Sequence, residues 1–197
     1  MTVARQAAWH LIAITDDLRD GTDGLVARAC SAERGGATML LLRLKHTDAH
    51  ALVSIARAMI AALQIPVVVS ERLDVALAAG AAGVHLNASS TPVMAVRQHV
   101  PAEFLIGGSV SGAADIESAL LSDYVTIGPV FTADAASMGV EGFRRLAEAC
   151  GRPAIAIGGI DPGSAVTLRA AGAAGVAVIR SVLGAADPAA AAAQFVL

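Results

Sequence analysis

The fold is decided by the segment Pro153-Ala154-Ile155-Ala156-Ile157-Gly158-Gly159-Ile160 and by its later counterpart, Ala174-Gly175-Val176-Ala177-Val178-Ile179-Arg180-Ser181. Each is a short apolar run rich in Ile, Val and Ala and bounded by Gly or Pro, which predicts a buried parallel strand. The first run ends in two glycines, whose amides can approach a ligand closely because no Cβ intervenes. In a (β/α)₈ barrel, the loops after strands seven and eight frequently bind phosphate. The pattern therefore predicts a phosphorylated small molecule at the end of a barrel.

The rest of the chain repeats the same strand–helix unit. Strands are predicted at 11–15, 38–44, 66–69, 83–86, 104–110, 124–131, 153–159 and from 175. Helices are predicted at 24–34, 47–63, 73–79, from 92, 115–121, 140–150, 162–172 and after 187, with Asp23, Thr47, Pro92 and Asp187-Pro188 at helix starts. Strict alternation calls for a parallel sheet, and eight units favour a closed barrel over an open sheet. We therefore expect an α/β fold, a (β/α)₈ TIM barrel, with residues 1–197 forming a single domain.

Composition limits the possible partners and compartments. Hydrophobic residues make up 55% of the 197 residues, charged residues 16%, and the net charge is −3, which excludes disorder and argues against nucleic acid as a partner. No apolar run is long enough to span a membrane, and the N-terminus has no signal-peptide pattern. Cys30 and Cys150 lack metal-ligand spacing and are expected to be reduced thiols. We expect a cytoplasmic protein with no membrane partner, and a homo-oligomer is compatible with the sequence.

Because barrel active sites occupy the carboxyl ends of the strands, the polar residues there are the candidates. Arg43 and Lys45 lie two residues apart at the end of strand two and therefore on one side of it. The remaining candidates at the strand ends are Thr15, Asp16, Asp17, Ser70, Glu71, Arg72, His85, Asn87, Ser109, Ser111, Thr126, Thr132, Asp134, Gly158, Gly159, Ile179, Arg180 and Ser181.

Six motifs follow one another along the chain: Leu42-Arg43-Leu44-Lys45, Gly80-Ala81-Ala82-Gly83-Val84-His85-Leu86, Ile106-Gly107-Gly108-Ser109, Asp123-Tyr124-Val125-Thr126-Ile127-Gly128-Pro129-Val130-Phe131, Ala156-Ile157-Gly158-Gly159-Ile160 and Gly175-Val176-Ala177-Val178. In this order they resemble thiamin phosphate synthase and, equally, the related TenI-like thiazole tautomerases. The likeness covers nearly the whole chain. Each motif is weak alone, but six in order are specific for the superfamily, whose members are (β/α)₈ barrels.

The resemblance implies roles where residues match. Lys45 falls on the synthase lysine that contacts pyrophosphate, with Arg43 beside it, and a lysine there would stabilise the departing charge. Ser109 matches a serine near the pyrimidine and pyrophosphate, and Gly158 and Gly159 match the loop that binds thiazole phosphate. Lys45, Glu71 and Ser109 are thus the candidate catalytic residues, and Glu71 is the candidate ligand for Mg²⁺ if synthase activity is retained. Arg43, Thr132, Gly158, Gly159, Ile179, Arg180 and Ser181 are the candidate substrate-binding residues.

Purely structural interpretations stay open beside these roles. Lys45 could instead pair with Glu71 or Asp16, and the Ser109 hydroxyl could bond its own backbone. The glycine pair could serve only the turn, and His85 could be a histidine hydrogen-bonded inside the barrel. Arg180 could bind a phosphate with two parallel hydrogen bonds or turn outward to Asp187.

The chain also departs from both families. Where the synthase has Asn-Asp before Arg72, this chain has Ser70-Glu71, and the segment 87–91 lacks the second metal-binding aspartate. Mg²⁺ on a pyrophosphate needs one or two carboxylates. The synthase's glutamine is Leu41, its histidine is Ser111, and its Thr-Lys phosphate clamp is missing from the loop 132–138. The tautomerase histidine is replaced by Pro129, which carries no proton, so acid–base work would fall to Glu71, Asp16 or His85.

Three hypotheses follow. The first is a synthase/TenI-like protein that binds a phosphorylated thiazole or pyrimidine precursor of thiamin, with altered or reduced chemistry. The second is an active synthase that joins pyrimidine pyrophosphate to thiazole phosphate and releases pyrophosphate. The third, from another class, is a non-catalytic binder of a phosphorylated ligand.

Overall fold

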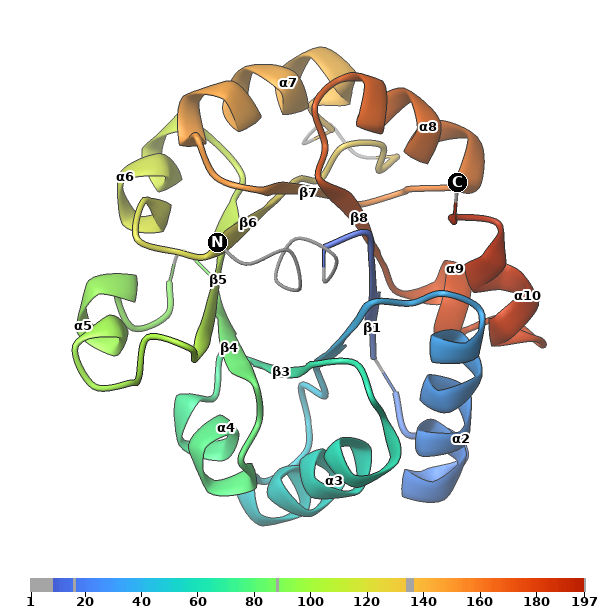
Figure 1. Ribbon diagram of the computed structural model, residues 1–197. Helices are drawn as coiled ribbons and strands as arrows, with labels where there is room; N and C mark the ends of the chain where they lie inside the picture. Colours follow the sequence, from blue (N-terminus) through green and yellow to red (C-terminus); the bar gives the residue numbers. More distant parts are fainter. Residues whose placement is uncertain (1–8, 16, 88, 134–136, 197) are drawn as a thin grey trace.

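The protein is a closed barrel of parallel strands surrounded by helices. The computed structural model describes residues 9–15, 17–87, 89–133 and 137–196. In these ranges each strand pairs in parallel with the next along the chain, and β8 pairs with β1 to close the barrel. Figure 1 looks down this barrel and shows the helices arranged as an outer ring. The predicted (β/α)₈ fold is confirmed.

The strands are short and the helices vary in length. The strands are β1 (Leu11–Ile14), β2 (Met39–Leu42), β3 (Val67–Ser70), β4 (Gly83–Leu86), β5 (Leu105–Val110), β6 (Tyr124–Ile127), β7 (Ala154–Ile157) and β8 (Gly175–Val178). The helices are α2 (Gly21–Arg34), α3 (Ala49–Ala62), α4 (Leu73–Ala79), α5 (Val93–Arg97), the 3₁₀ turn η1 (Ala113–Asp115), α6 (Ile116–Ala119), α7 (Gly139–Cys150), α8 (Pro162–Ala170), α9 (Arg180–Leu183) and α10 (Pro188–Ala193). No helix in the described ranges is both long enough and apolar enough to cross a bilayer.

Alternation along the strands divides the core in two. In β1, Ile12 and Ile14 belong to the cluster inside the barrel, whereas Leu11 and Ala13 belong to the cluster between barrel and helices. Successive side chains of a strand point to opposite faces, so both faces of each strand must be apolar. This explains why the strands are continuous apolar runs. The inner cluster also contains the two largest buried aromatic residues, Trp9 and Tyr124.

The element boundaries differ from prediction mainly at helix starts. The helix α2 begins at Gly21, so Asp23 lies inside its first turn and is not its cap. The helix α3 is capped by Asp48, whose side chain accepts a hydrogen bond from Ala51 N at 3.0 Å, and not by Thr47. Pro92 precedes the first helical residue of α5 and does not itself open the helix. Several polar residues stand at each of these starts, and only the backbone path selects the cap.

Two further boundaries bear on the site. The strand β6 ends at Ile127 and not at Phe131, because Pro129 follows and has no N–H for the ladder. The short helix α9 after β8 was not predicted, and it places Arg180 and Ser181 in a helical turn. The predicted cap at Asp187 is confirmed, since its side chain accepts hydrogen bonds from Ala189 N and Ala190 N.

Candidate functional site

A cavity of about 280 Å³ opens where the strands end. Its lining includes the last residue of four alternate strands, namely Ile14, Ser70, Val110 and Ile157. It also includes Arg43, Glu71 and Ser109 of the predicted site, together with His85, Asn87 and Thr126. The structure therefore brings predicted residues from strands two, three and five into one concave site at the carboxyl end of the barrel, where barrel enzymes place their chemistry.

The floor of this cavity is a cluster of hydroxyl groups around His85. The ring Nε2 lies 3.0 Å from Ser109 Oγ and 3.2 Å from Thr126 Oγ1, and Nδ1 lies 3.2 Å from the Tyr124 hydroxyl. Burial lowers the pKa of His85 to about 4, because the charged imidazolium would lose its hydration. His85 is thus the hydrogen-bonded barrel histidine that the sequence left open, and Ser109 bonds a neighbouring side chain.

Glu71 is held at the rim of the cavity in an unusual backbone conformation. Its φ of 64° lies in the left-handed region, which a residue with a Cβ adopts at a cost. Its Oε1 accepts a hydrogen bond from Asn87 Nδ2, while Asn87 Oδ1 accepts from the Ser89 amide and from the hydroxyls of Ser89 and Ser90. The loop after β4 is therefore folded around Asn87 and holds Glu71 through a neutral amide.

Cations flank a smaller cavity next to Glu71. Arg43, Lys45 and Arg72 line this space of about 140 Å³, and Arg43 also lines the larger cavity. Arg72 makes two hydrogen bonds to Asp74, at 2.9 and 2.6 Å. No ion pair joins Lys45 to Glu71, and the second alternative, Asp16, lies outside the described residues. Arg43 and Lys45 therefore remain available to an anion as far as the described residues show.

The phosphate-binding candidates meet in a third cavity, of about 240 Å³. Thr132, Gly158, Gly159, Ile179, Arg180 and Ser181 all line it. It adjoins the cavity above His85, because Ile157 and Ile179 line both. Three loops that are distant in the sequence thus converge as predicted. Of the loop 132–138, residues 134–136 lie outside the described residues.

Gly159 must be glycine for two reasons. Its φ is 69°, and a Cβ there would lie 2.1 Å from the carbonyl oxygen of Phe131. The close approach arises because the loop after β6 is bonded to β7 and the glycine loop: Val130 N donates to Ile157 O at 3.0 Å and Phe131 N to Gly158 O at 2.9 Å. Gly159 therefore has a conformational role, and it is also an exposed residue without a side chain.

Arg180 is exposed beside these glycines. The alternative partner, Asp187, caps α10 with its carboxylate and forms no ion pair with Arg180. Ser181 Oγ donates to Ile160 O at 3.3 Å, which ties the start of α9 to the end of the glycine loop.

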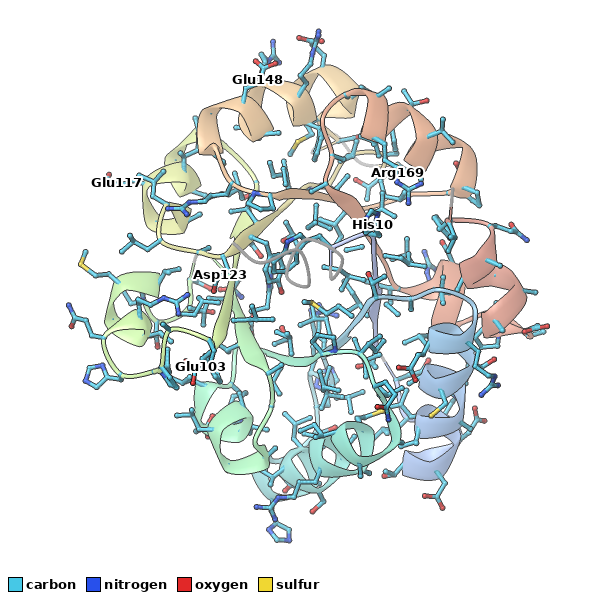
Figure 2. The ribbon with its side chains drawn as sticks, viewed as in Figure 1. His10, Glu103, Glu117, Asp123, Glu148 and Arg169 are labelled. Carbon is cyan, nitrogen blue, oxygen red and sulfur yellow. The ribbon has the colours of Figure 1, made fainter. Side chains whose placement is uncertain are left out.

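At the opposite end of the barrel, Asp123 has a structural role. Figure 2 labels His10, Glu103 and Asp123, which precede β1, β5 and β6. Asp123 Oδ2 accepts from Arg97 Nη2 at 2.6 Å and from Ile106 N at 2.8 Å, so this pair joins α5 to the starts of two strands. These residues lie away from the three cavities.

Thr126 and Asn87 were candidates at their strand ends without an assigned role, whereas Tyr124 was not a candidate. Strand parity could have found Tyr124, because it lies two residues before Thr126 and shares the inner face of β6. The role of Asn87 gives no signal in the sequence, since it depends on a loop contact with Glu71.

Comparison with known proteins agrees with this geometry. A family model described as thiamine monophosphate synthase matches residues 11–182. A thiamine-phosphate synthase of Albidiferax ferrireducens is 36% identical, with 93% of this chain and 89% of that protein covered. One of Methanoculleus marisnigri is 39% identical over 93% of this chain and 92% of its own.

Among solved structures, the thiamine phosphate pyrophosphorylase of Pyrococcus furiosus superimposes with a TM-score of 0.85 at 30% identity, covering 96% of this chain and 95% of its own. The family model spans most of the chain, and the relatives are covered nearly end to end. The chain therefore belongs to the thiamine monophosphate synthase family.

Proposed function

We propose that the protein binds a phosphorylated thiazole or pyrimidine precursor of thiamin at the carboxyl end of the barrel. The observation that carries this proposal is the convergence of Gly158, Gly159, Arg180 and Ser181 on one cavity that adjoins the cavity above His85. A phosphate group would bind in the first and a heterocyclic ring in the second.

Each cavity supplies a different interaction. Backbone amides at the glycine loop can donate to phosphate oxygens, and the Arg180 guanidinium can form charge-assisted hydrogen bonds to the same group. Apolar side chains of Leu41, Val110 and Ile157 would contact the ring in the larger cavity. Ser109 and Thr126 offer hydroxyls on its floor. This combination of apolar walls with a few directed polar groups is typical of small-molecule sites.

Synthase activity is a second candidate, favoured by Arg43 and Lys45 beside Glu71. In that reaction the carbon–oxygen bond between the pyrimidine methylene and the pyrophosphate breaks, and the thiazole nitrogen bonds to the methylene carbon. Lys45 and Arg43 would stabilise the charge on the leaving pyrophosphate. Ser109 would donate to the substrate from the cavity floor.

Magnesium fits this site only together with the substrate. In the described lining of the two cavities, Glu71 is the one carboxylate, and it already accepts a hydrogen bond from Asn87. The described residues also contain no cluster of three metal-ligating side chains. Mg²⁺ commonly combines one or two carboxylates with phosphate oxygens, so Glu71 and a pyrophosphate would hold it jointly. When bound, the ion would neutralise charge on the pyrophosphate.

These features favour precursor binding with reduced synthase chemistry. Incubation of the purified protein with pyrimidine pyrophosphate, thiazole phosphate and Mg²⁺ separates the candidates. Thiamin phosphate formed over several turnovers would make it a synthase. Binding of thiazole phosphate without turnover would make it a binder. Failure to bind either precursor would refute the proposal.

Replacement of Arg180 tests the phosphate cavity. Arg180→Ala should weaken binding of thiazole phosphate about tenfold, because a charge-assisted hydrogen bond to the phosphate is lost. Isothermal titration calorimetry measures the change. Arg152→Ala is the matched control, since Arg152 is also exposed but lies before the amino end of β7, whereas the glycine loop follows its carboxyl end. Equal affinities for the Arg180 variant and the wild type would remove Arg180 from the site.

A further inference from the structure

Strand register brings His85 and Tyr124 together across β5. His85 on β4 pairs with Gly107 on β5, and Gly107 pairs with Tyr124 on β6. A Cβ on Gly107 would lie 2.2 Å from His85 Nδ1 and 2.6 Å from the Tyr124 oxygen, so only glycine leaves room for their contact. His85 Nδ1 and the Tyr124 hydroxyl oxygen lie 3.2 Å apart over Gly107.

Two residues farther along β5 and β6, toward the cavity, lie the two hydroxyl groups that His85 also contacts. Ser109 pairs with Thr126 in the register, and each is two residues beyond Gly107 or Tyr124, so all four positions share the inner face. The His85 ring therefore connects a fully buried tyrosine to a half-buried serine that lines the cavity.

The protons carried by His85 and Tyr124 decide which group donates in each hydrogen bond of this series. His85 is buried and, in the part of the chain that the structure describes, its ring nitrogens contact only hydroxyl groups, so no anion there stabilises a charged ring and the uncharged ring carries one N–H. Burial also raises the pKa of Tyr124, which keeps its hydroxyl proton. Among the described residues, that hydroxyl contacts Nδ1 of His85, and a buried donor without an acceptor is costly. Tyr124 thus donates to Nδ1, and the ring proton is on Nε2.

The next hydrogen bond of the series joins His85 to Ser109. Its Oγ accepts from His85 Nε2 at 3.0 Å and from the Thr126 hydroxyl at 3.4 Å, which uses both of its lone pairs. Its own proton is left to point away from these partners, toward the cavity that Ser109 lines. Hydrogen bonds in series polarise one another, so this proton is a stronger donor than that of an isolated serine.

We propose that Tyr124, His85 and Ser109 form an uncharged hydrogen-bond relay that presents the Ser109 hydroxyl as a donor to the bound ligand, with Tyr124 as the positioning residue that sets its direction. The inference rests on the proposed function for the ligand, but the direction of the relay is a property of the free protein. The ligand atom concerned is an acceptor, either a phosphate oxygen or a ring nitrogen.

The first test is the tautomer of His85 in the ligand-free protein. In ¹⁵N NMR the ring signals of His85, one of five histidines, are those that disappear in His85→Gln. We expect the proton on Nε2 in the wild type and a mixture of tautomers in Tyr124→Phe, which keeps the ring and removes only the hydroxyl. A proton on Nδ1 in the wild type would overturn the relay.

The second test is a double-mutant cycle on thiazole phosphate affinity. Tyr124→Phe should weaken binding about fivefold in the wild type and leave it unchanged in a Ser109→Ala background, because Tyr124 acts only through Ser109. Ser122→Ala is the control, since Ser122 Oγ is buried and lacks a hydrogen-bond partner in the described residues, so its loss should alter neither tautomer nor affinity.

The outcomes separate the relay from the proposed function. Equal losses for Tyr124→Phe in both backgrounds would show a general structural effect and refute the positioning role. If no form of the protein binds either precursor, the proposed function fails, and the tautomer measurement still decides the relay. Thermal unfolding of each variant shows whether it has folded.

Discussion

At the scale of single residues, the site combines exposed cations at its rim with an uncharged floor. Lys45 and Arg180 are exposed and can contact an anion, whereas His85 and Tyr124 are buried and stay uncharged at neutral pH. A net charge of −3 gives the molecule no overall attraction for anions, so any affinity for phosphate must come from these local groups. Such a site would recognise a phosphate at its edge and a neutral ring in its depth.

The buried histidine makes stability depend on pH. Its pKa falls from 6.5 to about 4 on folding, so between these values the unfolded chain binds more protons and stability is lost as the pH falls. Between pH 7 and pH 5 this linkage should cost about 2 kcal/mol of the free energy of unfolding. Urea unfolding of the wild type and of His85→Gln, which cannot titrate there, should differ in pH dependence by that amount. Parallel pH profiles would disprove the linkage.

At the scale of secondary-structure elements, the turns after the strands decide what the site can bind. The glycine loop after β7 is pressed against the loop after β6, and the loops after β3 and β4 are joined through Glu71 and Asn87. The first loop pair holds the phosphate-binding candidates Thr132, Gly158 and Gly159, and the second holds the metal-binding candidate Glu71.

Gly151 and Gly159 both have a positive φ, but only Gly159 has a close neighbour at its Cβ position. Comparing them distinguishes backbone strain from a steric clash. Gly151 ends α7 at φ 58° with open space around its Cβ position, so Gly151→Ala should cost roughly 1 kcal/mol of stability and leave thiazole phosphate binding intact. Gly159→Ala adds a clash with the Phe131 carbonyl and should cost at least about 3 kcal/mol and weaken binding. Chemical denaturation and calorimetry measure both effects. Matching losses in the two variants would remove the special role of Gly159.

Exchange of one amide for a carboxylate should create a metal site. Asn87→Asp places a second carboxylate against Glu71, and in the absence of a cation the two like charges repel. We expect Mg²⁺ to raise the melting temperature of this variant and to have little effect on the wild type without pyrophosphate. Asn87→Ala is the control, because it removes the amide without adding charge. A variant insensitive to Mg²⁺ would show that the two oxygens cannot share an ion.

At the scale of the whole molecule, the apolar clusters that stabilise the barrel are separate from most of the residues argued to bind a ligand. The inner cluster fills the barrel below the cavity floor, and the outer cluster holds the helices against the strands. Within the described residues, the groups argued to bind ligand lie in loops or at strand ends at one end of the barrel, so changes at the other end should affect folding more than binding.

Substitutions of matched chemistry at different depths test this separation. Ile155→Ala removes a fully buried side chain from the inner cluster and should cost about 2–5 kcal/mol of stability. Leu77→Ala removes a side chain that is 51% exposed on α4 and should cost less than about 1 kcal/mol. Urea unfolding gives both values. Similar costs for the two variants would contradict the proposed packing.

The sequence by itself determined the barrel, the position of its strands and most of the residues that meet at its carboxyl end. It could do so because apolar runs alternate with helical patterns, and because parallel strands bring their carboxyl ends to one edge. Residues as distant as Thr132 and Ser181 could therefore be placed together without coordinates.

The tertiary structure alone decided the contacts within the site. It showed that Arg180 forms no ion pair with Asp187, that Asn87 holds Glu71, and that Gly107 opens a gap in which His85 meets Tyr124. These depend on register between strands, loop path and the space left by a missing side chain. Such quantities are set by packing between segments that are distant in the chain, and no local pattern encodes them.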